Sequence, residues 1–131
     1  PLVLPSCGGD TLWLSSSAAF ASLPEGMQND LRKLRAVHDL GTFRNKFAMD
    51  GDIRQGYDSF GVAVHPIVTE HPVTGQPCLF VNETFTVHIV GLMANESRRL
   101  LEYLFSHIQR PDLQVRWNWE LGDAVLWDNR R

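Results

Sequence analysis

The sequence predicts a mainly β fold with flanking helices, of the β-sandwich or barrel kind. Short apolar segments rich in β-branched residues dominate the chain, and two segments with helical spacing interrupt them. Strands and helices do not alternate in the regular way that builds a doubly wound sheet. The 131 residues, of which 44% are hydrophobic and 21% charged, suit one modest soluble domain with a real core.

The N-terminal third predicts two strands that enclose two short helices. A strand is expected at residues 12–14 and a short helix at 15–21. A second helix is expected at 24–33, because Met27, Leu31 and Leu34 recur at helical spacing, with Ser22 as its cap. Residues 35–40 then form a strand.

Residues 41–60 break this periodicity. Glycines and aspartates recur through the stretch, and its apolar residues follow neither helical nor strand spacing. Loops of this composition and length often cover an active site, so we expect a mobile active-site loop here.

The middle of the chain predicts a β-hairpin and a further strand. Residues 62–68 form a strand interrupted at Pro66, residues 71–77 form a turn rich in Pro and Gly, and residues 78–81 form the returning strand. The β-branched stretch 84–90 is expected to be extended.

The C-terminal third carries the clearest helix and the clearest strand. Apolar residues line one face of residues 94–110, Asn95 can cap the start, and Pro111 stops the end. Residues 113–119 alternate as a strand whose tryptophans, Trp117 and Trp119, are expected in the core. After a turn, residues 124–127 predict a buried apolar strand.

Composition and charge argue against some classes of partner. The net charge of −3, with both signs interspersed, argues against a nucleic-acid partner. No apolar run approaches the roughly 20 residues that span a bilayer, and residues 1–5 do not form a signal peptide. Because an initiator Met is missing, we expect the natural N-terminus upstream. Cys7 and Cys78 are expected to be free thiols in a reducing cytoplasm.

Histidines are the first candidates for metal ligands, but their pattern does not predict a metal site. None stands in a His-x-Asp or His-x-Glu pair, which places two ligands on the same face of a strand. His107 is expected to be a partly exposed helix residue, and His65 and His71, each followed by Pro, to shape a turn. His88 could point into a cavity, but nothing in the sequence supplies partner ligands for it, and His38 is the fifth histidine.

Other catalytic patterns are missing. The chain contains no Gly-x-Ser-x-Gly elbow of a serine hydrolase, and Gly8-Gly9 is too short a signal for a phosphate loop or a dinucleotide fingerprint.

An ordered series of motifs along nearly the whole chain resembles the taurine dioxygenase family of iron(II)- and 2-oxoglutarate-dependent oxygenases. Any one motif could arise by chance, but the ordered series could not plausibly do so. The principal motifs are Gly8-Gly9-Asp10-Thr11-Leu12-Trp13, His65-Pro66-Ile67-Val68, His71-Pro72-Val73-Thr74-Gly75, Leu79-Phe80-Val81-Asn82-Glu83-Thr84-Phe85-Thr86 and Trp127-Asp128-Asn129-Arg130.

The resemblance implies a double-stranded β-helix, or jelly roll, and oxidative chemistry on a small anionic substrate. Fe(II), 2-oxoglutarate and O2 would be the cofactor and cosubstrates. Hydroxylation of a sulfonate or an alkyl sulfate would release sulfite or sulfate and an aldehyde, with succinate and CO2 from 2-oxoglutarate. Relatives of this kind are commonly homo-oligomers, so a homo-oligomer is expected.

The resemblance also assigns roles to individual residues. Thr11 matches the threonine whose hydroxyl contacts a 2-oxoglutarate carboxylate, although a turn-capping role is open. Phe85 matches the phenylalanine that walls the substrate pocket, with ordinary core packing as the alternative. Phe43 lies near the substrate loop, where Arg44 takes the place of the family's aromatic residue. Asn82 is a further substrate-site candidate, with a turn role equally open.

Three expected groups have no match in these residues: the His-x-Asp pair, the distal His that follows the Trp-Asp-Asn-Arg motif, and an Arg beyond it. Arg131 follows Arg130 directly and does not fit that last position. Residues 1–131 are therefore interpreted as one partial dioxygenase domain with no metal site of its own. The alternative is a non-catalytic jelly-roll domain that binds a small ligand or a partner chain.

Overall fold

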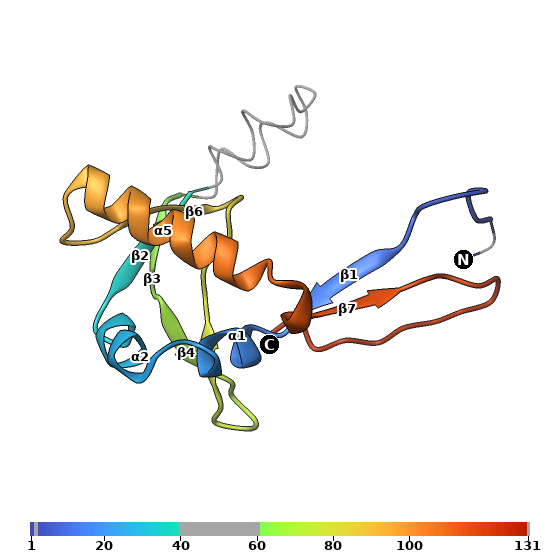
Figure 1. The fold of residues 1–131 in the computed structure, drawn as a ribbon, viewed down its shortest axis with the longest axis horizontal. Coiled ribbons are helices and arrows are strands. Elements are labelled where there is room, and N and C mark those ends of the chain that lie inside the picture. Colours follow the sequence, from blue (N-terminus) through green and yellow to red (C-terminus); the bar gives the residue numbers. More distant parts are fainter. Residues whose placement is uncertain (2, 40–60, 131) are drawn as a thin grey trace.

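The computed structural model describes residues 1, 3–39 and 61–130. In this part of the chain, strands are arranged in three small antiparallel sheets with helices packed alongside (Figure 1). The predicted mixture of strands and flanking helices is confirmed, and the described residues form no closed barrel. The elements in chain order are β1 (Thr11–Leu14), α1 (Ser16–Ala21), α2 (Glu25–Leu31), β2 (Arg35–His38), β3 (Ala63–Pro66), β4 (Val68–Glu70), β5 (Pro77–Leu79), β6 (Thr86–Ile89), α5 (Ala94–Ile108), the 3-10 helix η1 (Pro111–Leu113) and β7 (Gln114–Trp117).

The core lies between the sheet β3-β2-β6, the hairpin β4-β5 and the helices α1 and α5. Ala36 at the centre of β2 faces Ile89 on one neighbour and His65 on the other. The hydroxyl of Ser97 on α5 accepts a hydrogen bond from the Ile89 main-chain N–H at 2.8 Å, which ties the helix to β6. Residues buried in this core include Ala19, Phe20, Leu31, Ala36, Ile67, Leu79, Ile89, Leu101 and Leu104.

The α5 helix follows its predicted apolar stripe, but its ends differ from the prediction. Met93 is the N-cap, and the Glu96 carboxylate accepts a hydrogen bond from its main-chain N–H at 3.0 Å. The predicted cap Asn95 instead accepts from the N–H of Glu96, within the first turn. The helix ends at Ile108, because Pro111 begins a separate 3-10 turn.

The Ser22 cap predicted for α2 is wrong, because Ser22 closes the preceding helix. Its main-chain N–H reaches the Ala18 oxygen at 3.0 Å, and its hydroxyl donates to the Ala19 oxygen at 3.0 Å. The α2 helix begins after Pro24, whose fixed φ suits a helix start, and it ends two residues before the predicted Lys33.

The predicted interruption at Pro66 lies one residue further along. Pro66 is the last residue of β3 and faces Arg35. The strand is interrupted at the fully buried Ile67, and β4 begins at the next residue. Within the described sheet, β3 is an edge strand, so a proline without an N–H donor is tolerated there.

The end of the chain contradicts two predictions. The strand predicted at 113–119 is only β7, and Trp117 is 40% exposed rather than in the core. Residues 124–127 form no strand, and Leu126 is 99% exposed. Within the described residues β7 pairs with β1 alone, so this two-stranded ribbon projects from the body with no third strand beside it (Figure 1).

Two smaller expectations can also be compared with the structure. Cys7 and Cys78 are free thiols, as predicted, and only Cys78 is buried. Among the helices that the structure describes, none has the length and apolar character needed to cross a membrane.

Candidate functional site

A cavity of about 220 Å³ lies where β2, β3 and the turn before β6 meet. It is lined by Asn82 and Phe85, the two substrate-site candidates that the family resemblance took from one motif. The main-chain N–H of Asp39 donates to the Phe85 oxygen at 2.8 Å, which fixes this turn against the end of β2. The cavity is lined by His38, Asp39, Gly61, Ala63, His65, Phe80, Asn82 and Phe85.

Three rings form one wall of this cavity. The His38 and His65 ring centroids lie 5.4 Å apart, and the Phe80 centroid lies 5.1 Å from His38 and 5.5 Å from His65. The His65 ring stands nearly perpendicular to the other two, at 77° to His38 and 83° to Phe80, so the wall is a packed aromatic cluster that suits contact with a small organic ligand. The sequence prediction that His65 shapes a turn is wrong, because His65 lies within β3.

His38 is the group lining the cavity whose pKa is shifted from its ordinary value. Its Nδ1 atom lies 3.4 Å from the Thr86 hydroxyl, and its Nε2 atom is buried with no hydrogen-bond partner among the described residues. Burial lowers the pKa of His38, and the charge of nearby His65 lowers it further. His38 is therefore neutral at pH 7. The Thr86 hydroxyl also accepts from the Asn82 main-chain N–H at 3.0 Å and keeps both its proton and a second lone pair, so it can pair with either tautomer of His38.

Asn82 holds the turn that carries Phe85. Its side-chain oxygen accepts from the Phe85 main-chain N–H at 2.8 Å, and its main-chain oxygen accepts from the Thr86 N–H at 3.0 Å. The turn role that the sequence left open is thus present. The bond to Phe85 uses the amide oxygen, and the amide NH2 group has donors of its own that a ligand could use.

Thr11 is not brought to this cavity. It lies in β1 opposite Trp117, on the ribbon that projects from the body, and its hydroxyl accepts from the Trp119 indole N–H at 2.9 Å. A threonine hydroxyl keeps its own hydrogen for donation after accepting one bond. Phe43 and Arg44, together with the loop predicted at 41–60, lie outside the described residues.

His88 and His107 do not line this cavity. The prediction of a partly exposed His107 is wrong: it is buried, and its Nε2 atom lies 2.9 Å from the Ala19 oxygen and 3.0 Å from the Ser22 hydroxyl. His88 is half-buried in β6 opposite Val37. Within the described residues, no group of three or more His, Cys, Asp or Glu side chains could hold a metal ion. These residues therefore do not fit an iron site by themselves.

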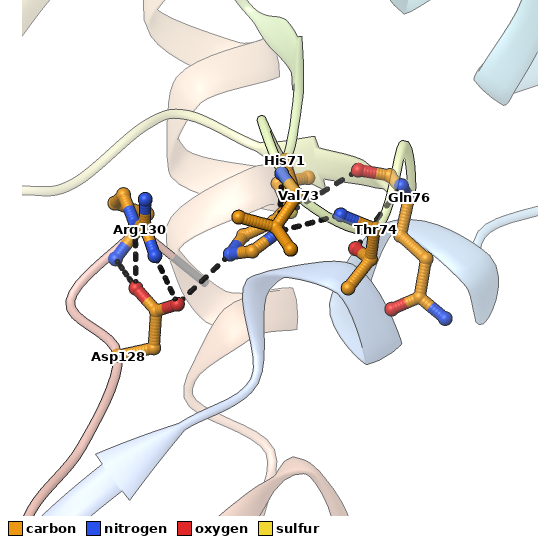
Figure 2. A network of polar contacts seen from close by, with 7 residues as sticks. His71, Val73, Thr74, Gln76, Asp128 and Arg130 are labelled. Carbon is orange, nitrogen blue, oxygen red and sulfur yellow. Dashed lines mark hydrogen bonds and ion pairs between the residues drawn. The ribbon is translucent and has the colours of Figure 1, made fainter.

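A second polar cluster joins two motifs that are far apart in the sequence. His71, in the turn between β4 and β5, lies against Asp128, which pairs with Arg130 (Figure 2). The predicted turn-shaping role of His71 is confirmed, because its Nδ1 atom accepts from the Thr74 N–H at 3.1 Å. The link to Asp128 was not predicted, since a separation of 57 residues carries no periodic signal. The one signal in the sequence for this contact is that the motif beginning at His71 offers an imidazole and the motif ending at Arg130 offers the Asp128 carboxylate.

Comparison with known proteins identifies relatives for the whole chain. The family model described as "Taurine catabolism dioxygenase TauD, TfdA family" matches residues 2–131. An alpha-ketoglutarate-dependent sulfonate dioxygenase of Saccharomyces cerevisiae is 36% identical over 97% of this chain and 31% of its own length. An alpha-ketoglutarate-dependent sulfate ester dioxygenase of Pseudomonas putida is 35% identical over 98% of this chain and 45% of its own length.

A solved structure supports the same relationship. The crystal structure of a taurine dioxygenase from Burkholderia xenovorans superposes with a TM-score of 0.76 at 33% identity, and the match covers 92% of this chain and 38% of that chain. The chain thus spans roughly a third to just under a half of the length of these relatives.

Proposed function

Because this chain belongs to the taurine catabolism dioxygenase TauD, TfdA family, we propose that the whole protein is an Fe(II)- and 2-oxoglutarate-dependent dioxygenase. The observation that carries the proposal is the match of the family model from residue 2 to residue 131. The relatives named above are alpha-ketoglutarate-dependent enzymes, and alpha-ketoglutarate is 2-oxoglutarate. The proposed fold of the complete domain is the double-stranded β-helix, of which residues 1–131 form part.

The proposed substrate is a small organic anion, a sulfonate or an alkyl sulfate. Relatives named for sulfonates and sulfate esters support this class. In the overall reaction O2 oxidises 2-oxoglutarate to succinate and CO2, one oxygen atom enters succinate, and the other enters a C–H bond beside sulfur or the ester oxygen. The hydroxylated carbon then forms a C=O bond as the C–S or C–O bond breaks. The products are an aldehyde and sulfite or sulfate.

The proposed roles of individual residues rest on the family resemblance and, for Phe85 and Asn82, on the cavity that they line. Phe85 and Asn82 contact the substrate from the cavity beside His38, where the ring wall offers apolar contact and the Asn82 amide offers donors. Thr11 contacts a carboxylate of 2-oxoglutarate through its hydroxyl. Phe43 is kept as a substrate-loop residue on the family resemblance alone. Fe(II), when bound, supplies O2 activation.

The proposal also includes an active-site loop, a homo-oligomeric state and a cytoplasmic location. We expect residues 41–60 to act as the active-site loop of a single domain. A homo-oligomeric, cytoplasmic enzyme fits the family resemblance and the two free thiols.

The test is turnover by the full-length protein. The protein is mixed with Fe(II), ascorbate and 2-oxoglutarate, and succinate is measured with and without a panel of sulfonates and alkyl sulfates. Succinate formation that rises with one of these anions supports the proposal. Binding of 2-oxoglutarate without succinate formation would favour the alternative, a non-catalytic ligand-binding domain.

A further inference from the structure

We propose that His71 is a positioning residue that fixes the segment Trp127–Arg130 against the turn between β4 and β5 through the carboxylate of Asp128. Its consequence for turnover rests on the proposed function, whereas its consequence for the geometry of the segment does not. Figure 2 shows the arrangement, with Asp128 between His71 and Arg130.

His71 is held rigidly before it meets Asp128. Its side chain is 4% exposed, its main-chain N–H donates to the Gln76 oxygen at 2.8 Å, and its own oxygen accepts from the Gly75 N–H at 2.8 Å. Gly75 has a φ of 68°, which glycine adopts without strain. The imidazole therefore projects from a closed turn whose geometry is set by the main chain.

The same turn sets the tautomer of His71. Nδ1 accepts hydrogen bonds from the main-chain N–H groups of Thr74 at 3.1 Å and Val73 at 3.4 Å. An N–H group donates, so Nδ1 carries no proton and the ring proton lies on Nε2. Nε2 lies 3.0 Å from Asp128 Oδ2 and donates to it. Main-chain geometry thus turns His71 into a fixed donor aimed at Asp128.

Asp128 in turn holds Arg130 through three hydrogen bonds. Its Oδ1 atom accepts from Arg130 Nε at 2.8 Å and from the Arg130 main-chain N–H at 3.1 Å, and its Oδ2 atom accepts from Nη2 at 2.8 Å. The bonds from the Arg130 side chain and main chain, and then the bond from His71, hold the pKa of Asp128 well below its usual range. The carboxylate is therefore ionised at neutral pH and binds both partners.

The positioned segment lies beside the candidate site. Arg130 lines a cavity of about 260 Å³ together with Thr69, Phe80 and Asn82. Phe80 and Asn82 also line the cavity that contains His38 and Phe85. A shift of the Trp127–Arg130 segment would consequently change the wall next to the proposed substrate-contact residues.

Two substitutions separate this role from simple maintenance of the turn. His71→Asn keeps a side-chain acceptor where Nδ1 lies, as asparagine does in Asx turns, but removes the donor to Asp128. His71→Gln keeps a donor at the position of Nε2 and removes the Nδ1 acceptor. If His71 only shapes the turn, Asn is the milder change; if it positions Asp128, Gln is the milder change.

The experiment uses the full-length protein with 15N-labelled histidine and tryptophan. In the unsubstituted protein the His71 nitrogen shifts should report a proton on Nε2. The Trp127 indole signal, assigned with Trp127→Phe, is the reporter of the segment, because the Trp127 ring lies 5.3 Å from the Trp13 ring. This signal should move or broaden in His71→Asn and stay in place in His71→Gln. Thermal unfolding shows whether each variant remains folded.

Turnover gives the second readout. kcat/KM should fall about tenfold or more in His71→Asn and be largely retained in His71→Gln, because a small misplacement of site groups slows reaction strongly. A His71 proton on Nδ1, or an unmoved Trp127 signal in His71→Asn, would overturn the positioning role. Absence of turnover in the unsubstituted protein would count against the proposed function alone, and the nitrogen and indole shifts would still decide the role of His71.

Discussion

The Nε2 atom of His107 lies 2.9 Å from the main-chain oxygen of Ala19, although 88 residues separate them. The contact joins the α5 helix to α1, and the Ser22 hydroxyl lies 3.0 Å from the same nitrogen. A polar ring buried at a helix interface is stabilising only while these bonds persist, because an unpaired buried donor is costly.

The first prediction concerns this interface. His107→Ala should lower the free energy of unfolding by about 1–3 kcal/mol, because a buried hydrogen bond and the packing of the ring are both lost. Arg98→Ala on the same helix is the control. It removes an exposed ion pair with Glu102 and should cost no more than about 0.5 kcal/mol. Equal urea midpoints for the two variants would show that His107 does not join the helices.

The second prediction concerns pH and His38. Its folded-state pKa lies below the ordinary value of 6.5, so the unfolded chain binds this proton more readily than the folded protein. The contribution of His38 to stability is complete above pH 6.5 and is lost as the pH falls below that value. Urea unfolding from pH 7.5 to 5 should show the loss, with a shallower slope in His38→Gln.

His65→Gln provides the control for that slope. Burial is the larger cause of the lowered His38 pKa and the charge of His65 the smaller one, so this variant should keep most of the pH dependence. A slope in His38→Gln as steep as in the unsubstituted protein would mean that other groups cause it.

The third prediction tests the cavity wall. Phe85→Ala should raise the KM for the sulfonate or alkyl sulfate about tenfold or more and leave the KM for 2-oxoglutarate unchanged, because only an apolar contact to the substrate is removed. Tyr103→Ala, an exposed aromatic residue on α5, should change neither constant. If Phe85→Ala lowers stability but leaves the substrate KM unchanged, Phe85 is a core residue, which is the alternative noted from the sequence.

The fourth prediction concerns Thr11. Thr11→Val should raise the KM for 2-oxoglutarate about tenfold, because an isosteric side chain without a hydroxyl cannot bind a carboxylate. Thr11→Ser should preserve it. Because Thr11 also accepts from the Trp119 indole, Thr11→Val should lower stability slightly as well. A lower stability with an unchanged KM would restrict Thr11 to its contact with Trp119.

Local patterns predicted most elements of the body of the fold. The α5 helix and the strands near β2, β5 and β6 follow from apolar spacing, because a core covers one face of each element. The wrong predictions concern segments that no core covers. Trp117 and Leu126 have the apolar character of core residues, yet the described residues place no layer over the β1–β7 ribbon or the segment after it.

The candidate site was predictable only through motifs. Asn82 and Phe85 were nominated by resemblance, and the structure places them in one cavity. His38 and Phe80 were not nominated, because their approach depends on the pairing of β2 with β3 and on the course of the chain after β5. The buried positions of His71 and His107 were missed for a related reason: each has partners from a distant part of the sequence.

The most direct test of the central claim is the stoichiometry of the reaction of the full-length protein with its best sulfonate or alkyl sulfate. Succinate and sulfite, or succinate and sulfate, are measured from the same sample over time. The proposed reaction predicts that both products rise together in a one-to-one ratio, and only when Fe(II), 2-oxoglutarate and O2 are all present. Release of sulfite or sulfate without succinate, or without a requirement for O2, would contradict it.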